Sequence, residues 1–156
     1  TRELFIFSCE TGLRFSDVLD LKWTHLKKDS KGVTYISKIQ CKTKELVEIP
    51  VTLKWPKVLL AKYRNVSTGE HVFPRLSNNC VNRKLKMLAE KAGIGKRLSF
   101  HVARHTHATM MLTLGADLYT VSKLLGHKNI ATTQIYAKIV DKKKEEAISL
   151  IPNLTD

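Results

Sequence analysis

The second half of the chain is divided by regularly placed helix caps, and this limits the folds that it can adopt. Three stretches each begin at a residue typical of helix N-termini and end at a glycine: Ser77 to Gly93, Ser99 to Gly115 and Asp117 to Gly126. Ser and Asp side chains accept hydrogen bonds from the free N–H groups of a first helical turn, and glycine readily adopts the left-handed conformation that ends a helix. The pattern predicts a run of short helices, followed by another at 132–139 and a last amphipathic helix from 141 onward.

The first half is predicted to place two strands among further helices. A helix through Cys9 should end at Gly12, and Ser16 should cap a short helix after it. β-Branched residues cluster at 32–39 and 46–51 and partly alternate with polar ones, which is typical of a β-hairpin. A helix from 53 to 64 follows. We therefore predict an α+β fold that is mainly α-helical, with a small antiparallel β-hairpin or sheet at one edge.

Charge favours a polyanionic partner. The chain has 156 residues, a length that suits one domain. It carries 27 Lys and Arg against 14 Asp and Glu, a formal net charge of +13. In the helix that starts at Ser77, we expect one face, Val81, Leu85, Leu88 and Ala92, to point inward. The opposite face of this helix is basic and carries Arg83, Lys84 and Lys86. We consider these three side chains, together with Lys44 of the hairpin, as DNA contacts.

The cysteines and the apolar segments predict a cytoplasmic location. Cys9, Cys41 and Cys80 are odd in number and lack metal or redox spacing, which fits a reducing compartment. No stretch approaches the length of a membrane span and no signal pattern opens the chain, so no membrane partner is expected. Thr1 leads directly into the first helix without an initiator Met, which suggests a fragment of a longer protein.

One predicted helix carries three cationic or polarisable side chains on a single face. His101, Arg104 and His105 stand at positions i, i+3 and i+4. Such a face suits an anion, although a merely solvated polar stripe has the same pattern. A zinc site is the third interpretation, but Val102 occupies the position of the general base in that motif, and no third ligand is evident. We predict no metal.

The order of several motifs resembles one family. Thr11–Asp17 reads TGLRFSD, the HVARHT segment starts at His101, and Leu-Gly-His127 is followed nine residues later by Tyr136. In this order and spacing the chain resembles the tyrosine recombinases, the phage integrase and Xer group. The resemblance spans nearly the whole chain and implies one catalytic domain over residues 1–156, without the N-terminal DNA-gripping domain of many members.

The resemblance implies a role for each of five residues. Tyr136 would attack a DNA phosphodiester to form a 3′-phosphotyrosine intermediate, without a metal or another cofactor. Arg14 and Arg104 would clamp the scissile phosphate, because guanidinium groups donate paired hydrogen bonds to its oxygens. His101 would take part in proton transfer with the tyrosine, and His127 would stabilise the transition state.

Three further positions take supporting roles by resemblance. Lys42 is our choice for the proton donor to the leaving 5′ oxygen, since it stands at the end of the first strand, although Lys44 on the same turn stays open. Asp17 would orient an active-site group, in a place where relatives often carry Glu. His105 would help from behind the phosphate site.

The resemblance also implies partners, and two other functions stay open. The partners would be double-stranded DNA at specific recombination sites and a homotetramer on that DNA; the isolated fragment would be a monomer. An apolar stripe would pack on a neighbouring protomer: Ala147, Ile148, Ile151 and Leu154. The alternatives are a helix-turn-helix DNA-binding protein over 117–136, which leaves Arg14, Lys42 and Arg104 without a role, and a type IB topoisomerase.

Overall fold

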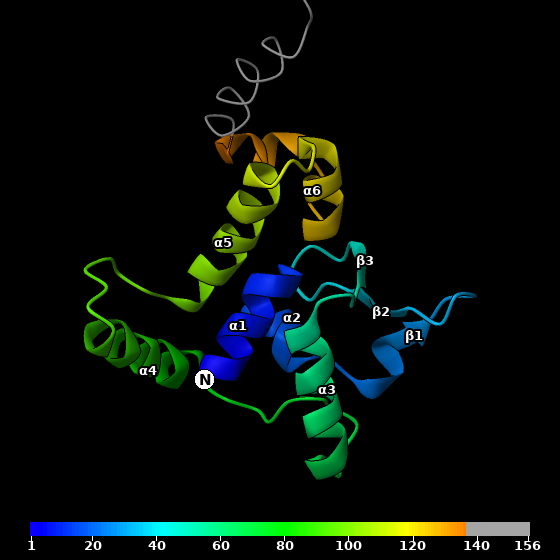
Figure 1. The fold of residues 1–156 in the computed structure, drawn as a ribbon, viewed down its shortest axis with the longest axis horizontal. Coiled ribbons are helices and arrows are strands. Elements are labelled where there is room, and N and C mark those ends of the chain that lie inside the picture. Colours follow the sequence, from blue (N-terminus) through cyan, green and yellow to red (C-terminus); the bar gives the residue numbers. More distant parts are fainter. Residues whose placement is uncertain (137–156) are drawn as a thin grey trace, which may run out of the picture.

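The computed structural model describes residues 1–136, and it shows helices arranged around a central one, with a small sheet at the edge (Figure 1). The helices are α1 (Arg2–Thr11), α2 (Phe15–Leu19), α3 (Lys54–Val66), α4 (Asn78–Lys91), α5 (Phe100–Thr113) and α6 (Leu118–Leu125). Three short 3-10 helices are η1 (Trp23–His25), η2 (Ile130–Thr132) and η3 (Gln134–Tyr136). The predicted α+β, mainly helical fold class is confirmed.

The sheet has three antiparallel strands in the order β1 (Leu26–Lys28), β2 (Thr34–Ile39) and β3 (Leu46–Pro50). The predicted hairpin is β2–β3, in which Ile39 pairs with Leu46 next to the turn. β1 was not predicted, because two of its three residues are lysines and no alternation is visible over so short a segment. Alternate residues of the hairpin face the core and pin its register: Ile36, Val47 and Ile49 are buried.

Two apolar clusters hold the fold together. The larger one surrounds α1, which lies at the centre of the molecule between α5, α3 and the sheet (Figure 1). Phe7 of α1 is fully buried and packs edge-on against Phe73, with ring centroids 5.0 Å apart. The smaller cluster lies between α5, α6 and η3 and includes Leu112, Leu125 and Tyr136. Tyr136 is therefore packed against α5, the helix that carries His101, Arg104 and His105, and against α6.

Most of the predicted caps are confirmed. The side chains of Ser77 and Asp117 accept hydrogen bonds from Cys80 N and Thr120 N in the first turns of α4 and α6. Gly12 and Gly126 adopt left-handed conformations at the ends of α1 and α6, with φ of 70° and 62°. These capped ends matter for function, because they lie beside the site described below.

Other local predictions were wrong. Ser16 does not cap α2, because the helix starts at Phe15 and Arg14 holds the N-cap position, two residues before Ser16. Leu88 and Ala92 are exposed, and Ala89 takes the inward position of α4 instead. The buried residues of α4 are four positions apart, so Ala89 follows Leu85, whereas the prediction placed the next buried residue three positions on, at Leu88.

The C-terminal predictions meet the structure only in part. The helix expected at 132–139 is represented by two single-turn 3-10 helices up to Tyr136. The remainder of that helix, the expected amphipathic helix and its apolar stripe lie outside the described residues. Within residues 1–136, no helix is long and apolar enough to cross a membrane, and the three cysteines are unpaired.

Candidate active site

Arg104 ties together the C-terminal ends of two helices. It projects from α5 and is only 4% exposed. Its Nη1 donates to the carbonyl oxygen of Gly12 at 2.8 Å, and its Nη2 donates to that of Leu125 at 2.6 Å. Helix C-termini carry partial negative charge, which favours a cation there. Burial, followed by the charge of Arg14, lowers the pKa of Arg104 to about 9, so the side chain stays cationic at neutral pH.

Glycine is required at both of these helix ends. A Cβ atom on Gly12 would lie 2.8 Å from His107 Cδ2, and one on Gly126 would lie 2.5 Å from Val47 Cγ1. Both residues also have the positive φ that L side chains rarely adopt. The close approach of α1, α5, α6 and the hairpin, which brings the site together, therefore depends on two residues that lack side chains.

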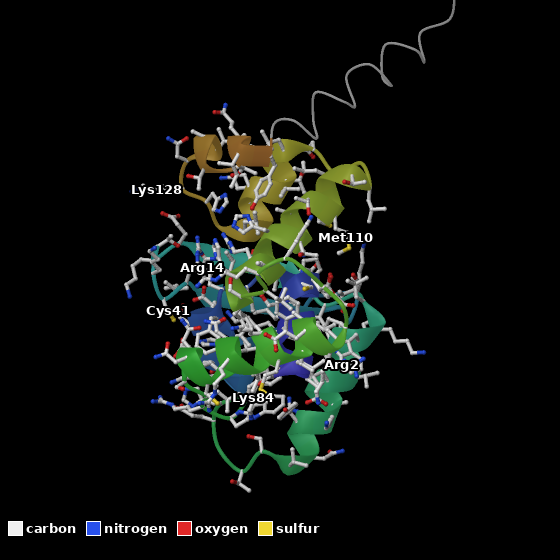
Figure 2. The ribbon with its side chains drawn as sticks, turned by 90° about the vertical axis from the view of Figure 1, so that its left-hand side faces the viewer. Arg2, Arg14, Cys41, Lys84, Met110 and Lys128 are labelled. Atoms are coloured by element: carbon white, nitrogen blue, oxygen red, sulfur yellow. The ribbon has the colours of Figure 1, made fainter. Side chains whose placement is uncertain are left out.

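Arg14 lies half-buried at the N-terminus of α2, where the lower part of the fold meets the upper helices (Figure 2). Its Nη1 donates to Gln40 Oε1 at 2.5 Å. Burial lowers the pKa of the guanidinium, and nearby Asp17 raises it. Within residues 1–136, every acceptor bonded to Arg14 or Arg104 is a neutral amide or carbonyl oxygen. The pair therefore retains positive charge that suits an anionic ligand.

Tyr136 reaches the site from η3. Its hydroxyl lies 2.6 Å from His105 Nδ1, and His101 stands on the preceding turn of α5 with its ring edge-on to that of His105, 4.5 Å between centroids. Burial raises the pKa of Tyr136, against the opposite effect of the Arg104 charge. The hydroxyl is therefore protonated at neutral pH and lies within hydrogen-bond distance of His105 Nδ1. His105 was expected to help from behind the phosphate site, and in the structure it lies against the Tyr136 hydroxyl.

His127 follows the left-handed Gly126 at the end of α6. Its Nδ1 lies within hydrogen-bond distance of Thr133 Oγ1, at 2.8 Å, and Thr133 is fully buried. Burial and the charges of Arg104 and Arg14 lower the pKa of His127 to about 4. Burial and the neighbouring positive charges also lower the pKa of His101. We infer that both imidazoles are neutral at pH 7 and that they line a strongly cationic site.

Lys42 is exposed on the turn between β2 and β3, three residues after β2 ends at Ile39. The turn is tethered by Asp17, which is fully buried and whose Oδ1 accepts a hydrogen bond from Cys41 N at 2.7 Å. The charge of Lys42 is among those that lower the pKa of His101. Asp17 thus holds the backbone next to Lys42. Lys44, also exposed, has a left-handed backbone with φ of 59°.

Comparison with known proteins decides the family. Residues 1–143 match the model of the phage integrase family. The chain belongs to the phage integrase family. It is 37% identical over 144 residues to the tyrosine recombinase XerC of Xanthomonas campestris pv. campestris, covering 88% of this chain and 42% of that protein. It is 45% identical over 84 residues to the tyrosine recombinase XerA of Saccharolobus solfataricus, covering 54% of this chain and 28% of the relative. The chain thus spans less than half the length of these relatives.

Solved structures share the fold of this integrase family member. A XerH site-specific recombinase bound to palindromic difH substrate superposes with a TM-score of 0.76 and 22% identity, over 96% of this chain and 45% of that one. The lambda integrase catalytic core superposes with a TM-score of 0.67 and 24% identity, over 81% of this chain and 78% of that one. At these identities the likeness establishes the fold.

Three polar residues of this integrase fold were missed by the sequence analysis. Gln40 is 1% exposed and bonds to Arg14, Thr133 faces His127, and Lys38 has a fully buried side chain. The Lys38 ammonium lies 3.5 Å from Asp17 Oδ1 and 3.0 Å from Asp20 Oδ2. For the ion pair of Lys38 with Asp17, the one signal in the sequence was a lysine at a strand position that faces the core. No local pattern marked Gln40 or Thr133.

The remaining predicted residues of this family member lie apart from the cluster. Arg83, Lys84 and Lys86 are exposed on α4, and Figure 2 shows Lys84 well below Arg14. Lys86 lies 4.0 Å from Glu90 of the same helix, a weak exposed pair. Residues 1–136 contain no group of three or more His, Cys, Asp or Glu side chains that could hold a metal ion.

Proposed function

We propose that this chain is the catalytic domain of a site-specific DNA recombinase that cuts and rejoins DNA through a 3′-phosphotyrosine. The observation that carries the proposal is the pair Arg14 and Arg104, whose hydrogen bonds go to neutral acceptors, beside the tyrosine hydroxyl of a phage integrase family member. A phosphodiester would supply the missing negative charge. The Tyr136 oxygen would bond to phosphorus, the 5′ oxygen would leave, and a 5′-hydroxyl of a partner strand would later reverse the step.

The attack requires that Tyr136 lose its proton, and two histidines are near enough to matter. His105 holds the hydroxyl at 2.6 Å in the DNA-free chain. His101 is exposed, and the charges of both arginines and of Lys42 lower its pKa. These three charged side chains surround the place where the phosphate would bind. We assign His101 the proton transfer once DNA is bound, and His105 the hydrogen bond that holds the hydroxyl before it.

The other groups would act on the phosphate and the leaving oxygen. We assign Thr133 as the hydrogen-bond donor to His127 Nδ1, which leaves the proton of the neutral imidazole on Nε2, free to donate to a phosphate oxygen in the transition state. Lys42 on the exposed turn would protonate the leaving 5′ oxygen. Asp17 would keep that turn in place through Cys41 N.

We infer that the partner is double-stranded DNA at specific recombination sites. Several solved relatives are complexes with DNA, including the XerH recombinase with difH substrate and a lambda integrase dimer on a core site. Arg83, Lys84, Lys86 and Lys44 would contribute phosphate contacts that weaken as salt rises. Four protomers would assemble on two duplexes in the bacterial cytoplasm, and the isolated domain would be a monomer.

A nicked suicide substrate tests this function. The short fragment between the cleaved bond and the nick leaves with its new 5′-hydroxyl and diffuses away, so the covalent protein–DNA adduct accumulates and is visible on a denaturing gel. We expect the adduct with the unchanged chain and with Tyr119→Phe, whose tyrosine is 61% exposed on α6, and none with Tyr136→Phe. An adduct that survives Tyr136→Phe would overturn the assignment, and a chain that binds but never cuts DNA would favour the helix-turn-helix alternative.

A plasmid relaxation assay distinguishes a recombinase from the remaining alternative, a type IB topoisomerase. A type IB topoisomerase would relax a plasmid that carries no recombination site, whereas a recombinase would exchange strands between two sites. We expect exchange in a two-site assay with the full-length protein and little relaxation of a plasmid without sites.

A further inference from the structure

Gln40 is a buried amide whose hydrogen-bonding groups all meet functional parts of the site. It follows β2 directly and is only 1% exposed. Its Oε1 accepts hydrogen bonds from Arg14 Nη1 at 2.5 Å and from Thr43 Oγ1 at 2.6 Å, and its Nε2 donates to the Leu125 carbonyl oxygen at 2.9 Å. Buried amides are costly unless they are satisfied in this way.

The Leu125 carbonyl connects Gln40 to the second arginine. This oxygen also accepts a hydrogen bond from Arg104 Nη2 at 2.6 Å. A continuous path therefore runs from the Arg14 guanidinium through the Gln40 amide and the Leu125 carbonyl to the Arg104 guanidinium. The bond from Thr43 adds the turn that carries Lys42 to the same path.

We propose that Gln40 is a positioning residue that sets the Arg14 guanidinium, relative to Arg104 and to the Lys42 turn, for one phosphate. This inference rests on the proposed function of the site. Gln40 touches none of the reacting atoms. It acts by fixing where the Arg14 charge stands, and its neutral amide oxygen does not cancel that charge.

The amide is chemically suited to this task, whereas its closest substitutes are not. A neutral amide oxygen orients a guanidinium without cancelling its charge. A glutamate would pair with Arg14 and weaken its attraction for phosphate, and its carboxylate could not donate to the Leu125 carbonyl. A methionine would fill the space but leave Arg14 without its acceptor.

The backbone around Gln40 is built for close contact. A Cβ atom on Gly126 would lie 2.8 Å from Gln40 Oε1 and 2.9 Å from its Cδ. The amide therefore lies directly against the glycine that ends α6. This contact joins the hairpin to the helix end that precedes His127.

The test measures the single-turnover cleavage rate on the suicide substrate and, separately, the affinity for the same DNA by fluorescence anisotropy. For Gln40→Glu and Gln40→Met we expect cleavage to fall at least about tenfold, with DNA affinity changed less than about threefold, because many phosphate contacts share the binding. Asn65→Asp, the same amide-to-carboxylate change at an exposed position of α3, serves as the control and should cleave like the unchanged chain. Thermal melts show whether each variant is folded.

A double-mutant cycle with Arg14→Lys separates positioning from a structural effect. If Gln40 acts through Arg14, Gln40→Met should reduce cleavage less than about twofold in the Arg14→Lys background. An equal reduction in both backgrounds would overturn the proposal, and so would wild-type cleavage by folded Gln40 variants. Thr43→Val, which removes only the turn contact, covers the case in which Gln40→Met fails to fold, and it should slow cleavage several-fold. A chain in which even the unchanged protein forms no adduct would instead refute the proposed function.

Discussion

The Nδ1 atom of His105 lies 2.6 Å from the hydroxyl of Tyr136, although the two residues come from different elements and are 31 positions apart. The tyrosine is packed into the small cluster between α5, α6 and η3, and it is only 7% exposed. In the DNA-free chain, the hydroxyl is thus held inside the fold by a histidine. Because Tyr136 must reach the phosphate, the exchange of this hydrogen bond for a contact with DNA becomes part of the proposed reaction.

The two histidines near Tyr136 should differ in their effect on cleavage. We expect His101→Gln to slow adduct formation by roughly a hundredfold or more, because it removes the assigned proton acceptor. His105→Gln should slow it less than about tenfold, since it alters only the bond made before DNA arrives. Single-turnover rates on the suicide substrate give the comparison. The reverse order would assign the proton transfer to His105.

Lys42 and Lys44 can be distinguished by changing the leaving group. A substrate with sulfur in place of the bridging 5′ oxygen has a better leaving group that needs no proton donor. We expect Lys42→Ala to cut the normal substrate slowly and the sulfur substrate at nearly the unchanged rate. Lys44→Ala should have a small effect on both. If the sulfur substrate restored cleavage by Lys44→Ala and not by Lys42→Ala, Lys44 would be the proton donor instead of Lys42.

Gly126→Ala should destabilise the domain more than the same change at Gly93. Both glycines have positive φ, 62° and 66°, which costs an alanine about 1–2 kcal/mol. At Gly126 the added Cβ would also lie 2.5 Å from Val47 Cγ1, whereas at Gly93 nothing lies within 4 Å. We therefore expect a loss above about 2 kcal/mol at Gly126, measured by urea unfolding. Equal losses would mean that the hairpin and α6 separate easily.

His127 should make the stability depend on pH. Its pKa is lowered to about 4 in the folded chain, against about 6.5 when unfolded, so between these values the unfolded state binds more protons. The free energy of unfolding should therefore fall as the pH drops from about 6.5 to about 4. His127→Gln should reduce this slope, measured as urea midpoints at pH 7 and pH 5. An unchanged slope would show that other histidines, such as buried His107, account for the dependence.

Much of the candidate site could be predicted because its residues belong to short ordered motifs. The spacing of His101, Arg104 and His105 on one helix face was sufficient to place them together, and the glycines at 12 and 126 ended the helices as expected. The Ser16 cap was wrong because α2 begins at Phe15. The exact residue at which a helix begins is the least certain part of such a prediction. The three-residue strand β1 forms through its pairing with β2, and its own sequence carries no sign of it.

The sequence by itself determined the family, the α+β class and the set of side chains that could act on a phosphate, since these depend on local spacing and on motif order. Only the tertiary structure decided which of them touch. Gln40 meets Arg14 across 26 positions and the Leu125 carbonyl across 85, and Arg104 meets the Gly12 carbonyl across 92. Such contacts arise when α1, α6 and the hairpin pack around glycines without side chains, and no local pattern encodes which polar atoms that packing will bring within hydrogen-bond distance.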